Sequence, residues 1–410
     1  MWLGTLWDIA AQLWCKIKDF FAHMQIFLYF CAEIMIEMQS DYTIYLQWVR
    51  AALWDEEVSG LLPAAGADVT RLMGVCCAQG TGPLVFTRML AHKEAFPAEA
   101  VQQMKMVCAQ TMQQQMRLQH TLLTAWKALA GAGIRAVLLK GAGLATLYRE
   151  PYLRAWGDVD LFVGKEQYHD ACRIMRETFP EALCPRGELD HCKHYNLIAD
   201  GVSIEVHYVS TAPEHPCDVQ RYYRIEREGM NSARVGHVTI GGVEMAVPET
   251  TFNSFYVFLH SWEHMLLKGA CLKQFCDMTL LLHRYAGAID RQRLGRYLRR
   301  MRLTDVWQLY MYVLVNHLGL AQAEAPFYSA SCAARAERML IDLLEGRMVK
   351  PKNEGQAPTN RIARKLFTMR QRMRNVHRIA RYSPSFARHM KIGIWLHGAS
   401  RFFARDRKWE

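Results

Sequence analysis

The sequence predicts a helix-rich protein of the α+β class. Strong helix formers run without proline or glycine over long stretches on both sides of the middle of the chain. Short, β-branched segments typical of strands are confined to residues 134–208. Methionine is frequent, with 22 residues, and glycine is modest, with 26, which also favours a helical protein.

The chain has 410 residues, enough for two or three domains that each have a hydrophobic core. Glycine and proline interrupt residues 59–74, helical patterns return after Pro248, and a polar segment with two prolines over 349–360 reads as a linker. We therefore expect four regions. They are an N-terminal helical region (1–75), a core with a preceding long helix (76–247), a helical domain that packs on the functional site (248–348), and a linker with a basic helical tail (349–410).

Both flanks of the core predict helices. Residues 1–60 read as two or three amphipathic helices rich in Trp, Phe and Met. A long helix is expected over 95–130, because its helix formers continue until Gly-Ala-Gly at 131–133. After Pro248 the pattern predicts helices over 248–266, 272–285, 288–303 and 305–320.

The middle of the chain alternates strands and helices. In order, we expect a strand (134–141), a short helix (142–148), a second strand (156–164), a longer helix (166–179) and a hairpin of two strands (194–208). The first strand is a short apolar run ended by Gly141, on which the short helix opens directly. The hairpin turns at Asp200 and Gly201, a favoured pair for a tight turn.

Positive charge is concentrated in the tail. The formal net charge of the chain is +11, but residues 350–410 alone carry +13, which leaves −2 for the rest. The tail mixes Trp395, Phe402 and Phe403 with Lys and Arg, a composition that suits an interfacial helix on anionic phospholipid or a binding surface for RNA. The alternative is a solvated basic face of a structural helix.

Other features indicate the compartment. The N-terminus lacks the pattern of a secretory signal, and Glu33 interrupts the most apolar segment, 24–38, before the ~20 residues that a spanning helix needs. The twelve cysteines are scattered without a C-x-x-C, so neither a zinc knuckle nor a regular disulfide framework is indicated. We expect a cytoplasmic protein whose tail would allow a peripheral position at a membrane.

The main chemical signal is "GDVDLF", residues 157–162. Because strand side chains alternate between faces, Asp158 and Asp160 project from the same side. Two adjacent carboxylates repel, and the pKa of each rises unless a cation lies between them. Mg²⁺ prefers such hard oxygen ligands and leaves room for phosphates. A solvent-facing edge strand is the alternative.

A third carboxylate lies on the later hairpin. Glu205 stands between two apolar residues, with His207 on the same strand face. An Asp-x-Asp strand followed by a single-carboxylate strand is the layout of two-metal phosphoryl transfer. We therefore expect Asp158, Asp160 and Glu205 to be catalytic and to bind two Mg²⁺ ions. His207 is either a core histidine or a partner that orients Glu205.

Lys140 and Gly141 predict a phosphate-binding turn. Together they end a strand and begin a helix, whose first N–H groups and positive dipole end attract anions. Gly141 allows a close backbone approach, and Lys140 can meet a phosphate charge. Arg154, four residues before Asp158, is placed to help neutralise a nucleotide.

These segments together resemble the uncharacterised nucleotidyltransferase family of the polymerase-β-like superfamily. The likeness covers roughly residues 120–290 and is strongest over "VLLKGAGLATLYREPYLRAWGDVDLFV", 137–163, where strand-Lys-Gly, a helix, an Arg and Asp-x-Asp follow in the order of the family. The later "IEVHY", 204–208, is similar to its third-carboxylate strand, which often carries a His two residues on.

The resemblance implies a small mixed β-sheet with flanking helices and a Mg²⁺-dependent transfer of a nucleoside monophosphate from a nucleoside triphosphate to an acceptor hydroxyl, with release of pyrophosphate. The implied nucleotide-binding residues are Lys140, Gly141, Ala142, Gly143 and Arg154. Ala142 departs from the Gly-Ser turn usual in the superfamily, so phosphate binding would rely on backbone N–H groups and Lys140. The alternative function is a nucleotide-binding pseudoenzyme, or a basic adaptor that docks nucleic acid or an anionic membrane.

One further motif competes with this interpretation. "HSWEH", 260–264, matches an inverted zincin pattern, but no third ligand at suitable spacing is evident. We expect instead that this helix covers the nucleotide site, with Asp277 beginning or facing the same cleft.

Overall fold

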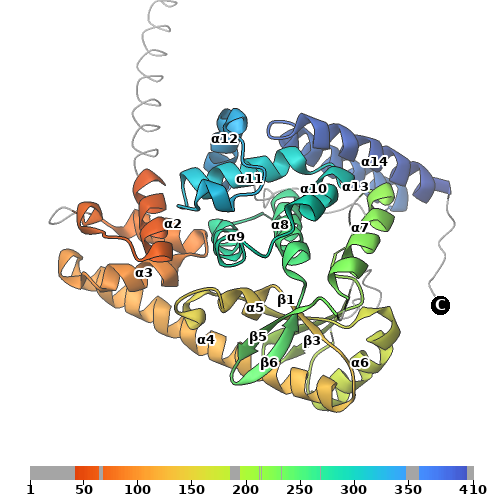
Figure 1. Ribbon diagram of the computed structural model, residues 1–410, viewed down its shortest axis with the longest axis horizontal. Helices are drawn as coiled ribbons and strands as arrows, with labels where there is room; N and C mark the ends of the chain where they lie inside the picture. The colour runs from red at the N-terminus through yellow and green to blue at the C-terminus, as the bar shows by residue number, and fades with distance from the viewer. Residues whose placement is uncertain are drawn as a thin grey trace, which may run out of the picture.

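The computed structural model describes residues 42–63, 68–184, 194–211, 213, 215–231, 233–267, 269–347 and 360–403. Two hydrophobic cores organise these residues: one joins the sheet to its covering helices, and the other fills a larger helical body. In Figure 1 the helical body lies above the sheet and α4 runs along the opposite side. This arrangement confirms the predicted helix-rich α+β class.

The N-terminal part of the described chain is helical. A helix over 42–54 is followed by three helices, the last of them 34 residues long: α2 (Thr70–Ala78), α3 (Gly82–Leu90) and α4 (Ala98–Gly131). The break expected over 59–74 ends earlier, because α2 begins at Thr70. The helices expected before residue 42 lie outside the described residues.

A four-stranded mixed sheet forms the centre, as the family resemblance implied. Its strands are β1 (Val137–Leu139), β2 (Asp158–Phe162), β3 (His194–Ala199) and β4 (Val202–His207). Their order is β1-β2-β4-β3; β2 and β4 are parallel, and the other pairs are antiparallel. The helices α5 (Gly141–Ala145) and α6 (Gly164–Thr178) follow β1 and β2.

The alternation of the strands separates the two faces of this sheet. Val159 and Leu161 of β2, with Ile204 and Val206 of β4, belong to the core that α4 and α6 cover. Because side chains alternate along a strand, the polar residues between them point to the opposite face. Burial of the apolar face thus sets which side of the sheet carries the carboxylates.

Two elements of the middle region were not anticipated from the sequence. They are the helix α7 (Pro216–Gly229) and a separate hairpin formed by β5 (Gly236–Ile240) and β6 (Val243–Val247). The hairpin turns at Gly241 and Gly242, whose φ angles are 55° and 76°, the left-handed backbone of a tight turn. The Gly-Gly pair in the sequence was therefore a signal from which this hairpin could have been predicted.

The helical body contains the expected helices and one more in the same region, α12. Its members are α8 (Thr250–Leu267), α9 (Leu272–Arg284), α10 (Arg291–Arg300), α11 (Thr304–Asn316), α12 (Ala333–Leu344), α13 (Arg361–Ile379) and α14 (Pro384–Phe403). Short 3-10 helices occur at Ser59–Leu61, Lys93–Ala95, Pro151–Leu153, Gln322–Glu324 and Ala330–Cys332. The expected linker over 349–360 lies outside the described residues except for its last position.

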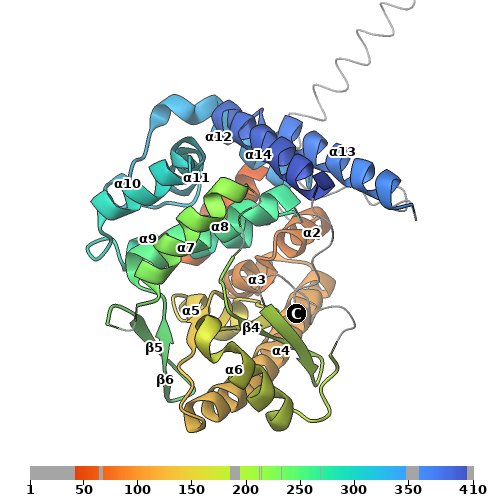
Figure 2. The same cartoon turned by 90° about the vertical axis from the view of Figure 1, so that its right-hand side faces the viewer.

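Aromatic side chains hold α8, α9 and α11 together. Phe258 meets Trp307 edge to face, with ring centroids 5.0 Å apart, and Phe275 stacks on Tyr310 at 4.3 Å. Each of these rings is fully buried, which stabilises the fold by about 2–3 kcal/mol per side chain. In Figure 2, α13 and α14 pack at the top of this body, close to α12.

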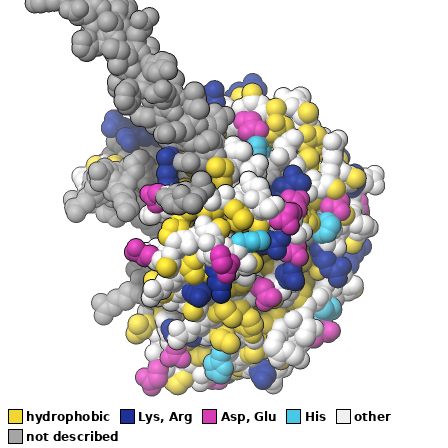
Figure 3. All heavy atoms as spheres, turned by 90° about the vertical axis from the view of Figure 1, so that its left-hand side faces the viewer, with side chains coloured by type: hydrophobic (Ala, Val, Ile, Leu, Met, Phe, Trp, Pro, Cys, Tyr) yellow, Lys and Arg dark blue, Asp and Glu magenta, His cyan; other side chains and the backbone are white. Residues whose placement is uncertain are grey.

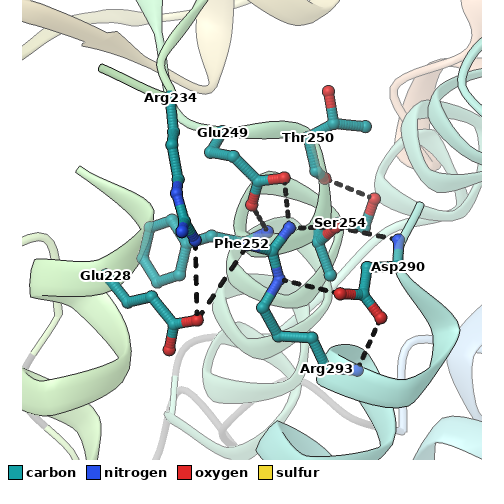
Figure 4. A network of polar contacts seen from close by, with 9 residues as sticks. Glu228, Arg234, Glu249, Thr250, Phe252, Ser254, Asp290 and Arg293 are labelled. Atoms are coloured by element: carbon teal, nitrogen blue, oxygen red, sulfur yellow. Dashed lines mark hydrogen bonds and ion pairs between the residues drawn. The ribbon is translucent and has the colours of Figure 1, made fainter. Parts of the chain in front are cut away.

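A polar junction joins α7, α8 and α10 (Figure 4). Arg293 donates to Glu249 at 2.5 Å and to Thr251 at 2.8 Å, while Asp290 accepts from the backbone N–H of Arg293 as the N-cap of α10. Glu228 near the end of α7 lies 4.0 Å from Arg293. The junction ties the segment after the sheet to the helical body.

The surface of the body is electrically mixed. On the face seen in Figure 3, acidic and basic side chains are interspersed, as expected when residues outside the tail carry a formal charge of only −2. Within the described parts of the chain, no helix combines the length and hydrophobicity needed to cross a bilayer.

Candidate active site

Three carboxylates meet on the face of the sheet opposite the core that α4 and α6 cover. The parallel register of β2 and β4 pairs Asp160 with Glu205, so Asp158, Asp160 and Glu205 each offer an oxygen within 4.8 Å of the others. The Asp160 side chain is fully buried, whereas Glu205 is one-fifth exposed. The structure therefore brings together the three residues that the sequence predicted as metal ligands.

A lysine and a histidine contact the innermost carboxylate. Lys140 Nζ lies 3.1 Å from Asp160 Oδ1, and His207 Nε2 lies 2.9 Å from the same oxygen. Burial raises the pKa of Asp160, but Lys140 and His207 outweigh it and hold that pKa well below its usual range. His207 Nε2 also lies 3.2 Å from Glu205 Oε2, so it orients two of the three carboxylates.

The cluster still has room for more positive charge. The charge of Asp160, with burial, raises the pKa of Asp158 to about 6. Asp160 Oδ2 is buried and accepts no hydrogen bond from the described residues. A buried carboxylate oxygen without a donor is costly unless a cation is supplied. These oxygens fit a divalent metal ion.

His194 is a member of the site that the sequence analysis missed. It lies on β3 directly opposite His207, and its Nδ1 is 3.4 Å from Glu205 Oε2. His194, Glu205 and His207 also form a group with metal-ligand spacing. Counting the register outward from the Asp200-Gly201 turn would have placed His194 beside His207.

The predicted phosphate turn has an unusual backbone. Lys140 has φ 45°, and Gly141, with φ 29°, follows it directly. A side chain at Gly141 would meet the Asp158 carbonyl oxygen and the Trp156 ring at 3.4 Å. Left-handed backbone at a non-glycine residue stores about 1–3 kcal/mol and is found where function needs it. Since α5 has only five residues, the Lys140 charge is the stronger attraction for an anion here.

Arg154 has a protein partner in the structure. It is buried and donates from Nε and Nη2 to the two oxygens of Asp277, at 3.0 and 2.5 Å, and from Nη1 to the Gly141 carbonyl oxygen at 3.1 Å. The Tyr148 hydroxyl donates to Asp277 at 2.8 Å. Asp277 of α9 is therefore linked through Arg154 to the phosphate turn. A direct contact of Arg154 with nucleotide remains a prediction.

The remaining residues singled out from the sequence lie on α5 and α8. Ala142 and Gly143 belong to α5, where Ala142 is buried in the sheet core. Glu263 of the HSWEH segment accepts a hydrogen bond from Thr211. Among the metal-spaced groups that the described residues form, none contains His260 or His264.

The chain is similar to a known protein family and to one solved structure. A family model described as uncharacterised nucleotidyltransferase matches residues 65–319. A crystal structure of an antigenic nucleotidyltransferase-like protein from Paracoccidioides brasiliensis is similar at 16% identity and a TM-score of 0.33, over 52% of this chain and 94% of that chain. Among proteins with curated descriptions, none matches. Because the family match spans more than half of the sequence and contains the whole carboxylate cluster, the chain belongs to the uncharacterised nucleotidyltransferase family, which confirms the resemblance and the expected class of enzyme.

Proposed function

We propose that this nucleotidyltransferase moves a nucleoside monophosphate from a nucleoside triphosphate to an acceptor hydroxyl and depends on Mg²⁺. The observation that carries the proposal is the group formed by Asp158, Asp160 and Glu205, with Asp160 Oδ2 buried and lacking a donor among the described residues. Three hard oxygen ligands on one sheet face are the donor set that Mg²⁺ prefers, and two ions would suit two-metal transfer.

Each residue of the site would then have a separate role. Lys140 binds the triphosphate, and His207 holds Asp160 and Glu205 in orientation. Arg154 fixes the turn through the Gly141 carbonyl oxygen. The acceptor hydroxyl gives up its proton to water, and its oxygen forms a bond to the α-phosphorus as the bond from this phosphorus to the pyrophosphate oxygen breaks. Divalent ions bound by the carboxylates would supply Lewis acidity to both the attacking and the leaving oxygens.

The test is release of pyrophosphate from each α-labelled triphosphate in the presence of Mg²⁺ and a broad set of acceptors. Asp160→Asn should abolish turnover, because the ions lose a charged ligand. Asp200→Asn is the matched control: it sits exposed at the hairpin turn with φ 50°, which Asn tolerates, and should keep activity. Triphosphate binding without turnover in wild type would instead favour a pseudoenzyme.

We also propose that the basic tail docks on an anionic lipid surface. The exposed face of α14 carries Arg388, Lys391, Ile392 and Trp395 at helical spacing. Ile392 is 58% exposed and Trp395 is 57% exposed, large apolar side chains beside two cations. Basic and apolar groups on one helix face suit the headgroup boundary of a membrane.

Binding of the full chain to vesicles containing phosphatidylserine tests this docking. The double variant Ile392→Ser, Trp395→Ser should bind the vesicles more weakly, because less apolar area would enter the lipid. Binding of the wild-type protein should weaken as the salt concentration rises. Met116→Ser, which alters an equally exposed apolar residue on α4, serves as the control. Binding to single-stranded RNA but not to vesicles would overturn the proposal.

A further inference from the structure

A second group of metal-binding side chains lies outside the candidate active site. His215 and Asp218, at the start of α7, meet His389 of α14, which is 171 residues beyond Asp218 in the sequence. All three are buried, with exposed fractions of 4%, 3% and 6%. Each offers one nitrogen or oxygen within 4.8 Å of the others.

The group is compact. His389 Nε2 lies 2.5 Å from Asp218 Oδ2, and the His215 ring stacks on the His389 ring with centroids 3.9 Å apart and planes 9° from parallel. Two imidazoles and one carboxylate are thus withdrawn from water at a single point between two helices. Removing such polar groups from water is unfavourable unless each gains a strong partner.

We propose that His215, Asp218 and His389 form a zinc site that fastens α14 to α7. Zn²⁺ binds imidazole nitrogen and carboxylate oxygen at about 2.0–2.2 Å, so two ligand atoms of a tetrahedral ion are about 3.3 Å apart. The 2.5 Å contact between His389 and Asp218 would have to open by roughly 0.8 Å. One imidazole would also have to rotate out of the parallel stack, because the lone pairs of two parallel rings do not converge on one ion. The nitrogen-rich set favours zinc over Mg²⁺, which prefers oxygen ligands.

Neighbouring residues support such a site. Arg221 Nη1 donates to Asp218 Oδ1 at 2.8 Å, which leaves Oδ2 directed at His389 and the carboxylate fixed from behind. Metal-ligating carboxylates are commonly held in this way. Gly393 of α14 lets the His215 ring approach, because a Cβ there would lie 2.3 Å from His215 Cδ2.

This zinc site does not depend on the proposed chemistry, since it shares no residue with the catalytic carboxylates. Its consequence is mechanical: the inner face of α14 is fastened to the body while Ile392 and Trp395 stay on the outer face. Phe386, Met390 and Ile394 of α14 already pack in the core of the body, and bound zinc would hold α14 there more firmly.

The test is zinc binding by the full chain, measured by competition with a chromophoric chelator. The measurement uses a Glu205→Gln background, because Glu205 belongs to both metal-spaced groups of the active site and its loss weakens each of them. One tightly bound zinc per chain is expected. His389→Gln and His215→Gln should each weaken binding more than about a hundredfold, and Arg221→Ala by about ten- to a hundredfold. His317→Gln, in a His–Glu pair on α11 and α12, is the matched control and should bind zinc normally.

A second measurement covers variants that fold poorly. Cobalt(II) added to the metal-free protein should give the visible spectrum of a tetrahedral site, and the spectrum should disappear in both histidine variants. Far-ultraviolet circular dichroism confirms that each variant is folded. Wild-type protein that takes up no zinc, or zinc uptake unchanged in folded His389→Gln, would overturn the proposal.

Discussion

Asp277→Ala tests whether α9 positions the phosphate turn. Asp277 is buried and accepts both charged contacts from Arg154, together with the Tyr148 hydroxyl. Removing the carboxylate leaves the buried guanidinium without a counter-charge. Breaking a buried pair from one side destabilises a protein by about 3–5 kcal/mol, because the remaining charge is not compensated. The free energy of unfolding, measured with urea, should fall by that amount.

A double-mutant cycle separates the pair from simple loss of packing. Arg154→Met leaves the Asp277 charge unpaired, whereas the double variant removes both charges. The two single losses should therefore not add, with a coupling free energy on the order of 2–3 kcal/mol. If the variants still fold at low temperature, both should be slow in the pyrophosphate assay. Arg154→Met removes the donor to the Gly141 carbonyl oxygen, and Asp277→Ala removes the carboxylate that holds this donor in place.

Additive losses would refute this reasoning. If the coupling free energy is smaller than about 0.5 kcal/mol, Arg154 and Asp277 do not stabilise each other. If Asp277→Ala loses stability but keeps full activity, the pair supports the fold and not the phosphate turn. Asp342→Asn, a buried carboxylate of α12 far along the chain, controls for nonspecific loss of a buried acid.

Two other predictions concern Lys140 and Glu226. Lys140→Ala should weaken triphosphate binding by about ten- to a hundredfold, because one charged hydrogen bond is lost. The affinity for Mg²⁺, measured by titration, should stay the same or rise, because Lys140 competes with the metal for Asp160. Unchanged triphosphate affinity would show that Lys140 does not belong to the site. Burial raises the pKa of Glu226 from 4.5 to about 7, so its contribution to stability is present at low pH and is lost as pH rises through that range. Glu226→Gln keeps an acceptor for Ser210 but cannot ionise. Its free energy of unfolding in urea, relative to that of wild type, should therefore rise by up to about 3 kcal/mol between about pH 5 and 8. If the free energies of the two proteins change in parallel with pH, the reasoning is wrong.

Local periodicity determined much of the candidate site. Asp158, Asp160, Glu205 and His207 could be placed on one face from the sequence, because side-chain alternation in a short strand needs no knowledge of distant residues. The apolar residues between them set which face is buried. The helix-rich α+β class followed in the same way, from patterns that extend over one element at a time.

Two elements were missed for different reasons. The α7 helix is polar, so it was not distinguished from a connecting segment until its packing on the helical body was known. In β5 and β6 less accessible residues alternate with exposed ones on both sides of the Gly241-Gly242 turn, a local hairpin signal that the sequence analysis did not use. Local propensity is a weak guide where tertiary contacts supply most of the stability.

Pairings between distant segments were decided by the tertiary structure alone. Arg154 was expected to face a nucleotide, but α9 brings Asp277 to it from 123 residues away. His389 reaches Asp218 through the docking of α14 on α7. The approach of His194 to Glu205, by contrast, follows from the register of one local hairpin. The identity of a charged residue in the sequence does not show whether its side chain contacts water, a ligand or a buried counter-ion. Only packing, which fixes distance and removes water, selects among them.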